Sequence, residues 1–202
     1  MLYNIVMNND SILPDNSRPT RSDAVKNHSL LLETAQRLFD QEGLENVSMS
    51  AIAEAAGVGK GTLYRHFKNK SELAHVLLDQ DMRDLQTRAL RRLQGNGDPL
   101  KDLRWFLEQV VRFVDRNQAL LCVAARENVS VLNAPAHLWW RQTIRGLLLR
   151  VTPPPVADVD YLADMLYIMV DVQTIRFQKQ THGYNLERLI NGVDEILSLI
   201  NP

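Results

Sequence analysis

Apolar residues recur at helical spacing along almost the whole chain beyond residue 22. In the first such stretch, at about residues 26–41, Leu31, Ala35 and Leu38 fall on one face of a helix. The strict alternation of apolar and polar positions that is typical of half-buried strands is hard to find. The pattern therefore predicts an all-α fold of about nine helices.

Four of the predicted helices make up the N-terminal part, and residues that favour helix ends separate them. Gly43 ends the first helix and Gly57 ends the second. Ser48 is placed to cap the second helix and Asn69 the fourth, with Glu72 at the position that completes a capping box. The expected ranges are about 26–41, 48–57, 59–67 and 69–93.

A break rich in glycine, with a proline, at residues 95–99 separates these helices from the C-terminal part. Beyond it, the apolar periodicity predicts helices at about 99–116, 118–127, 135–151, 158–180 and 185–200. The chain is therefore expected to comprise a mobile arm at residues 1–22, a helix-turn-helix domain at 23–75 and a larger helical domain at 76–202.

Composition and charge restrict what kind of site the chain can carry. Hydrophobic residues make up 45% of the 202 residues, and the net charge is −1, so a nucleic-acid site has to be a local basic patch. Cys122 is the single cysteine, which excludes a disulfide within the chain and fits a reducing compartment. Because there is no run of 18 apolar residues and no secretory signal, we expect no membrane span and a cytoplasmic location.

Positive charge gathers in one short segment. Residues 55–71 contain Lys60, Arg65, Lys68 and Lys70 but no acidic residue. A short basic helix that follows another helix through a tight turn is typical of a helix-turn-helix, whose second helix enters the major groove of DNA. The alternative interpretation is an ordinary solvated helix face.

The side chains of this segment divide by size and polarity into different contacts. Gly59 and Gly61 leave room for the backbone to approach DNA, while Lys60 and Thr62 lie where base edges can be reached. Hydroxyl, imidazole and ammonium groups suit phosphates, which assigns Tyr64, His66 and Lys70 to the DNA backbone; alternatively, Tyr64 and His66 serve the fold. The full predicted DNA-binding set is Ser48, Ser50, Gly59, Lys60, Gly61, Thr62, Tyr64, Arg65, His66 and Lys70.

Residues 57–70 closely resemble the recognition-helix signature of TetR-type bacterial repressors, and they read GVGKGTLYRHFKNK. The resemblance covers about residues 27–75, because two preceding segments also match that family in order and spacing: Ala35-x-x-Leu38-Phe39-x-x-x-Gly43 and Met49-x-x-Ile52-Ala53-x-x-Ala56-Gly57. Gly59 stands where the family often has serine, and glycine is an acceptable helix cap.

The resemblance implies an all-helical homodimer whose N-terminal domains bind a palindromic operator in double-stranded DNA. It also implies a C-terminal domain that holds the dimer interface and a pocket for a small-molecule inducer. Repression is the default activity that the family suggests, and the inducer itself is unknown.

The C-terminal pattern indicates where two copies would meet. Leu186, Val193 and Ile200 recur every seven residues, which resembles the seam of a coiled coil. The helix expected at 158–180 is apolar on most sides, so it is either a central helix of a monomer or shared between its own domain and a partner. The predicted interface residues are Met169, Val172, Leu186, Leu189, Val193, Ile196, Leu197 and Ile200.

Aromatic residues concentrate in the C-terminal half, where they either line a ligand pocket or form an ordinary core. Ligand sites are mostly apolar with a few polar groups, which makes an apolar or aromatic inducer the expectation. The predicted ligand-binding residues are Trp105, Phe106, Gln109, Phe113, Arg126, Trp139, Thr143, Tyr161 and Met165.

Two other function classes are weaker on the sequence. An enzyme would need a catalytic motif, and neither a phosphate loop nor the pattern GxSxG, CxxC or HxxE is present. The five histidines show no metal-ligand spacing, so no metal, cofactor or catalytic residue is predicted. A pure interaction protein would not need Lys60, Thr62, Tyr64 and Lys70 together.

Overall fold

The computed structural model describes residues 21–95, 97–121 and 135–200, and within these ranges helix is the only regular structure. The all-α prediction is therefore confirmed. In chain order the helices are α1 (Arg21–Glu42), α2 (Met49–Ala55), α3 (Lys60–His66), α4 (Lys70–Leu93), α5 (Pro99–Arg116), α7 (Pro135–Leu148), α8 (Val159–Met169), α9 (Val172–His182) and α10 (Leu186–Ile200).

The predicted caps Ser48 and Asn69 start helices α2 and α4. The Ser48 hydroxyl accepts a hydrogen bond from the Ala51 backbone N–H at 3.1 Å, which starts α2. The Asn69 side chain accepts from the Glu72 N–H at 2.8 Å, and the Glu72 carboxylate accepts from the Lys68 N–H at 2.6 Å. This pair of bonds differs from a standard capping box, because Glu72 reaches the residue before the cap.

The helix expected at 158–180 is in fact two helices. α8 ends at Met169, and α9 begins at Val172 after Asp171, whose carboxylate accepts a hydrogen bond from the Gln173 N–H at 2.8 Å. Apolar periodicity could not show this break, because both helices bury a face and apolar residues continue across it. The acidic cap at Asp171 was the signal.

Other helix boundaries differ from the expected ones by a few residues. α1 begins at Arg21, so the last two residues of the expected arm are helical, and the rest of that arm lies outside the described residues. α7 ends at Leu148 instead of residue 151. Residues 118–121 are helical, and the remainder of the helix expected to reach 127 lies outside the described residues.

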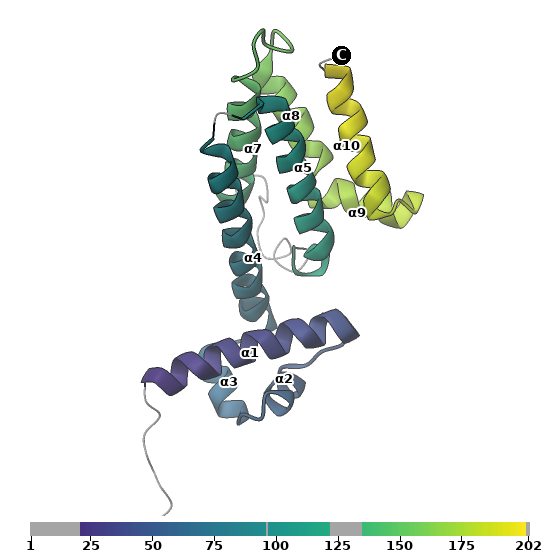
Figure 1. Cartoon of the computed structure of the whole chain (residues 1–202). Coiled ribbons are helices and arrows are strands. Elements are labelled where there is room, and N and C mark those ends of the chain that lie inside the picture. Colours follow the sequence, from purple (N-terminus) through teal and green to yellow (C-terminus); the bar gives the residue numbers. More distant parts are fainter. Residues whose placement is uncertain (1–20, 96, 122–134, 201–202) are drawn as a thin grey trace, which may run out of the picture.

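The buried side chains form two clusters, and α4 contributes to both. The first, the N-terminal cluster, joins α1, α2 and α3 to the start of α4 through residues such as Leu31, Leu63 and Leu77. These helices and the start of α4 are called the N-terminal unit below. The second joins the later part of α4, from Leu85, to the helices that follow. Figure 1 shows this arrangement: α1, α2 and α3 gather at one end of α4, and α5, α7 and α8 stand along its other end.

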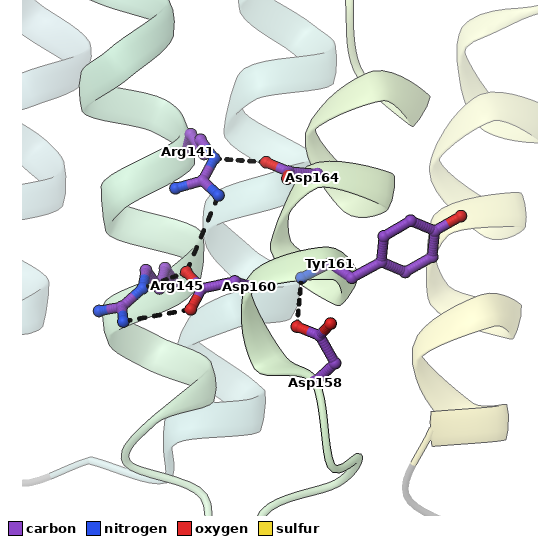
Figure 2. A network of polar contacts seen from close by, with 6 residues as sticks. All are labelled: Arg141, Arg145, Asp158, Asp160, Tyr161 and Asp164. Carbon is purple, nitrogen blue, oxygen red and sulfur yellow. Dashed lines mark hydrogen bonds and ion pairs between the residues drawn. The ribbon is translucent and has the colours of Figure 1, made fainter.

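Ion pairs fasten α7 to α8 (Figure 2). Arg141 donates to Asp164, and Arg145 donates to Asp160 at 2.5 Å, while Arg141 also lies 3.8 Å from Asp160. The hydrogen bond from Arg145, together with the charges of both arginines, holds the pKa of the Asp160 carboxyl below its ordinary value. Two arginines on α7 thus face two aspartates on α8, which fixes the register of the two helices.

None of the helices in the described ranges combines the length and the apolar character that crossing a membrane requires.

Candidate nucleic-acid interface

α3 is held by its buried face and presents the opposite face outward. Leu63 is fully buried and Phe67, which follows the helix, is 1% exposed, so both anchor α3 in the N-terminal cluster. Lys60 and Arg65 are exposed, and the Tyr64 ring keeps 49% of its surface accessible. The outward face therefore carries two cations and a phenol.

Gly59 and Gly61 have no steric reason within the chain to lack a side chain. A Cβ atom added at either position would meet no atom within 4 Å, and neither backbone has a positive φ. Gly57 differs, because its φ of +66° lies in the left-handed region that favours glycine at a turn. The open space at Gly59 and Gly61 is what close approach of another molecule would require.

Arg65 lies back along α3. Its guanidinium donates to the Thr62 hydroxyl at 3.0 Å and to the Gly61 carbonyl at 3.2 Å. These contacts are exposed and local, so they order the side chain without burying its charge. The Thr62 hydroxyl is thus engaged within the helix, although the sequence analysis assigned it to base edges.

Lys70 is placed differently from the other predicted DNA contacts. Its ammonium donates to the Leu44 carbonyl at 2.7 Å, to the Val47 carbonyl at 3.0 Å and, at 3.4 Å, to the Glu45 carbonyl. These carbonyls belong to the loop between α1 and α2, and the loop ends at the cap residue Ser48. Lys70 therefore holds the segment that positions α2.

His66 lies in an aromatic group between α1 and α3. The His28 ring stacks on Phe67 at 5.0 Å between centroids and lies 5.6 Å from the His66 ring. Burial lowers the pKa of His66 below its ordinary value, and the nearby charges of His28 and Arg65 lower it further. His66 thus packs between α3 and α1, as in the structural alternative, and its contact with DNA stays a prediction.

The two serines of the predicted set lie at the start of α2. Ser48 uses its hydroxyl to cap the helix, and Ser50 is half-buried in the first turn. The structure therefore brings Ser48, Ser50 and the α3 residues into one N-terminal unit, in which Lys60, Tyr64 and Arg65 are exposed.

The predicted ligand residues do not all gather in one place. Phe106 and Phe113 are buried on α5, where each ring meets the edge of a tryptophan on α7. Trp105 lies under the Arg92 guanidinium, and the Gln109 side chain accepts from Arg88 at 2.6 Å. Trp139 is half-buried against Phe106, and the Thr143 hydroxyl donates to the Trp139 carbonyl. Met165 is half-buried and Tyr161 is 63% exposed. Arg126 lies outside the described residues. Their role in ligand binding stays a prediction.

The predicted dimer seam is largely filled by its own chain. Leu189, Val193 and Leu197 belong to the second buried cluster, because α10 packs along α5, and Val172 belongs to it because α9 also contacts α5. Met169, Leu186 and Ile200 are half-buried against the same cluster, and Ile196 is 41% exposed. Other apolar residues on α8, α9 and α10 are more accessible: Tyr161, Ile168, Phe177 and Leu199, at 48–78% exposure. The sequence did not predict that Ile168, Phe177 and Leu199 are exposed, because a seven-residue repeat identifies an apolar face and does not show what covers it.

Residues 31–77 match the family model described as bacterial regulatory proteins, tetR family. A curated relative, an HTH-type transcriptional regulator of Staphylococcus aureus (strain bovine RF122 / ET3-1), is 37% identical over 109 residues. That match covers 54% of this chain and 59% of the relative, so the chain spans less than two thirds of the length of the curated relatives that it matches.

Solved structures share the fold across most of the chain. A TetR-family transcriptional regulator from Pectobacterium atrosepticum has a TM-score of 0.66 at 20% identity, over 89% of this chain and 95% of that one. A gamma-butyrolactone receptor described as an ArpA-like protein has a TM-score of 0.59 at 27% identity, over 86% and 87% of the two chains. The segment that holds the helix-turn-helix, residues 31–77, is therefore similar to the tetR family of bacterial regulatory proteins.

Proposed function

We propose that this protein regulates transcription by binding a palindromic DNA operator as a homodimer, and that a small molecule releases it. The observation that carries the proposal is the outward face of α3. Lys60 and Tyr64 project from a helix that Leu63 anchors, within a segment that contains no acidic residue. Repression is proposed on the resemblance to the tetR family, for which it is the default activity.

The proposed contacts follow from the position of each group on α3. With α3 in the major groove, Lys60 at its first turn reaches base edges and the Tyr64 hydroxyl reaches a phosphate. Gly59 and Gly61 allow the backbone to come close, because no side chain stands between it and the DNA. The two half-sites lie about one helical turn apart, since the two-fold axis of a dimer imposes that spacing.

The test is operator binding measured by fluorescence anisotropy with DNA from upstream of the protein's own coding region. We expect Lys60→Ala to weaken binding and to blur sequence preference by about 1–3 kcal/mol, and Tyr64→Phe to weaken all sequences alike. Lys101→Ala on α5 is the matched control, because Lys101 is also exposed and lies outside the N-terminal unit. Equal binding by wild type and a Lys60/Tyr64 double variant would contradict the proposal.

The proposed dimer forms through the accessible apolar residues of α8 and α10. Ile168 on α8 is 48% exposed, and Ile196 and Leu199 on α10 are 41% and 78% exposed. Large apolar side chains that remain accessible are the candidates for an interaction surface. Association of two copies would cover this surface and bring together the two N-terminal units that a palindrome needs.

The proposed route from ligand to DNA passes through α4 and the end of α5. Asn117, 2% exposed, donates to the Asp81 carboxylate at 2.9 Å, and Arg116 donates to the same oxygen at 3.1 Å. Leu120, just beyond, packs into the N-terminal cluster. A ligand that shifts the end of α5 would therefore move α4 and change the separation of the two α3 helices.

Ligand control also draws support from a relative of similar fold, the gamma-butyrolactone receptor, which is named for a small molecule. A ligand can release the operator only by binding the two states of the dimer unequally. The expected coupling is about 1–3 kcal/mol, which corresponds to about 5–150-fold in operator affinity.

A further inference from the structure

A cavity lies beside the break between α8 and α9. After Asp171 the chain changes direction, and α9 leads to α10 through the turn at Gly183 and Tyr184 (Figure 1). A cavity of about 230 Å³ lies among α5, α8, α9 and α10. At about 30 Å³ for each molecule of liquid water, this volume corresponds to roughly eight waters.

The walls of this cavity are mainly apolar. Val111 of α5, Met169 of α8, Ile175 of α9 and Val193 of α10 line it. The side of α10 is opened by Gly192, where an added Cβ atom would meet nothing within 4 Å. The cavity therefore suits a short hydrocarbon chain, which would replace water against these side chains.

One cation borders the cavity and is held in place by an aromatic ring. The Arg188 guanidinium lies 3.9 Å from the centroid of the Tyr184 ring, and both residues line the cavity. Tyr184 is itself positioned by the His182 ring at 5.6 Å, which in turn meets the edge of Phe177. Among the described residues, no carboxylate pairs with the Arg188 guanidinium.

A second polar group lines the same cavity. Gln178 of α9 is half-buried there, and its side-chain amide has no hydrogen-bond partner among the described residues. A guanidinium and an amide together supply the donors that a carboxylate accepts. Glu187 and Glu195 border the adjoining hollow with Arg188, so a ligand with more than one negative charge is disfavoured.

We infer that this cavity binds a small monocarboxylic acid with an unbranched apolar chain, the carboxylate at Arg188 and Gln178 and the chain among Val111, Ile175 and Val193. The inference deepens the proposed ligand control, on which its regulatory meaning rests. Binding itself is measured without DNA, so the inference and the proposed function can fail separately.

The test is isothermal titration calorimetry of the full chain with octanoate and, as a neutral probe of the same chain length, 1-octanol. We expect octanoate to bind more tightly than 1-octanol. Arg188→Gln should weaken octanoate by about tenfold, the loss expected for one charge-assisted hydrogen bond, and should leave 1-octanol unchanged. Arg112→Gln is the matched control, because Arg112 is an exposed arginine of α5 that does not line the cavity.

A second variant tests the position of the chain. Gly192→Leu has space for its Cβ atom and should fill the cavity, so it should abolish binding of both probes. Circular dichroism and sedimentation equilibrium show whether this variant keeps the wild-type fold and assembly. Val111→Ala, which removes apolar contact from the α5 side of the cavity, should weaken binding of both probes and serves if Gly192→Leu does not fold.

Two results would overturn the inference. One is the absence of octanoate binding to the wild-type chain at millimolar concentration. The other is binding that Arg188→Gln and a folded Gly192→Leu leave unchanged, which would place octanoate elsewhere.

Discussion

Lys70 is a basic residue of a DNA-binding segment whose ammonium is already engaged by three backbone carbonyls of its own chain. Truncating it removes this donor from all three carbonyls, and the bonds to Leu44 and Val47 are partly buried. We expect Lys70→Ala to lower the free energy of unfolding by about 1–3 kcal/mol, measured by urea denaturation. Lys70→Arg should recover only part of this loss, because a planar guanidinium cannot direct its donors to the same three oxygens.

The salt dependence of operator binding by Lys70→Ala shows whether Lys70 contacts a phosphate or acts by holding the loop before α2. Each phosphate contact contributes about one to the slope of log affinity against log salt concentration. If Lys70 acts by holding the loop before α2, Lys70→Ala weakens operator binding while that slope stays at the wild-type value. A slope lower by about one would instead show that the ammonium leaves the loop for a phosphate.

His66 gives the N-terminal unit a pH dependence of definite sign. Its folded-state pKa lies below the ordinary value of 6.5, so the unfolded chain takes up a proton that the folded chain resists. Stability is therefore fully present above that value and falls as the pH drops through the window between 6.5 and the lowered pKa. Thermal unfolding followed from about pH 8 to about pH 5 should show the fall, and His66→Gln should reduce it. An unchanged pH dependence in the variant would contradict this assignment.

At the scale of elements, the start of α9 depends on one side chain. The Asp171 carboxylate satisfies the Gln173 N–H, which otherwise has no helical partner. We expect Asp171→Ala to lower the free energy of unfolding by about 0.5–2 kcal/mol and Asp171→Asn to have a much smaller effect, since asparagine caps equally well. Urea denaturation measures both, and equal losses would show that the carboxylate charge matters more than the cap.

Helix boundaries were predictable from the sequence where a capping side chain or a glycine- and proline-rich break marks them. Asn69 and Asp98 mark the starts of α4 and α5, and both ranges were predicted to the residue at their C-terminal ends. Position 171 was missed because the apolar pattern continues through it, and periodicity reports burial rather than direction. A helix that turns but stays buried therefore has the same apolar pattern as one that continues.

The candidate site, like the helix boundaries, was predictable only in part from the sequence. The sequence identified the outward residues of α3, because charge and polarity belong to individual side chains. It could not identify what Lys70 contacts, since the carbonyls of residues 44–47 are distant in sequence and every residue has a carbonyl. For α10, Val193 and Leu189 are on an apolar face as predicted, but α5 of the same chain covers that face.

For the molecule as a whole, the difference between apolar residues buried within one chain and those that stay accessible decides which variants test the proposed dimer. Val193 is 5% exposed, so Val193→Glu buries a charge within its own chain and should unfold it. Ile168 and Leu199 are accessible, so a double change to glutamate should leave the monomer folded and prevent association. Sedimentation equilibrium at micromolar concentration measures this, and Leu90→Glu on the exposed face of α4 is the control. Persistence of the dimer in the double variant would rule out the proposed face.

The two buried clusters meet inside one uninterrupted helix, between Leu77 and Leu85 of α4. This has a consequence for building chimaeras with related regulators. Each residue added to this stretch rotates one unit by about 100° against the other and lengthens the helix by about 1.5 Å. An insertion of seven residues returns to within about 20° of the original orientation. Exchange of the N-terminal units between relatives should therefore preserve the coupling only where the junction keeps the helical phase of α4.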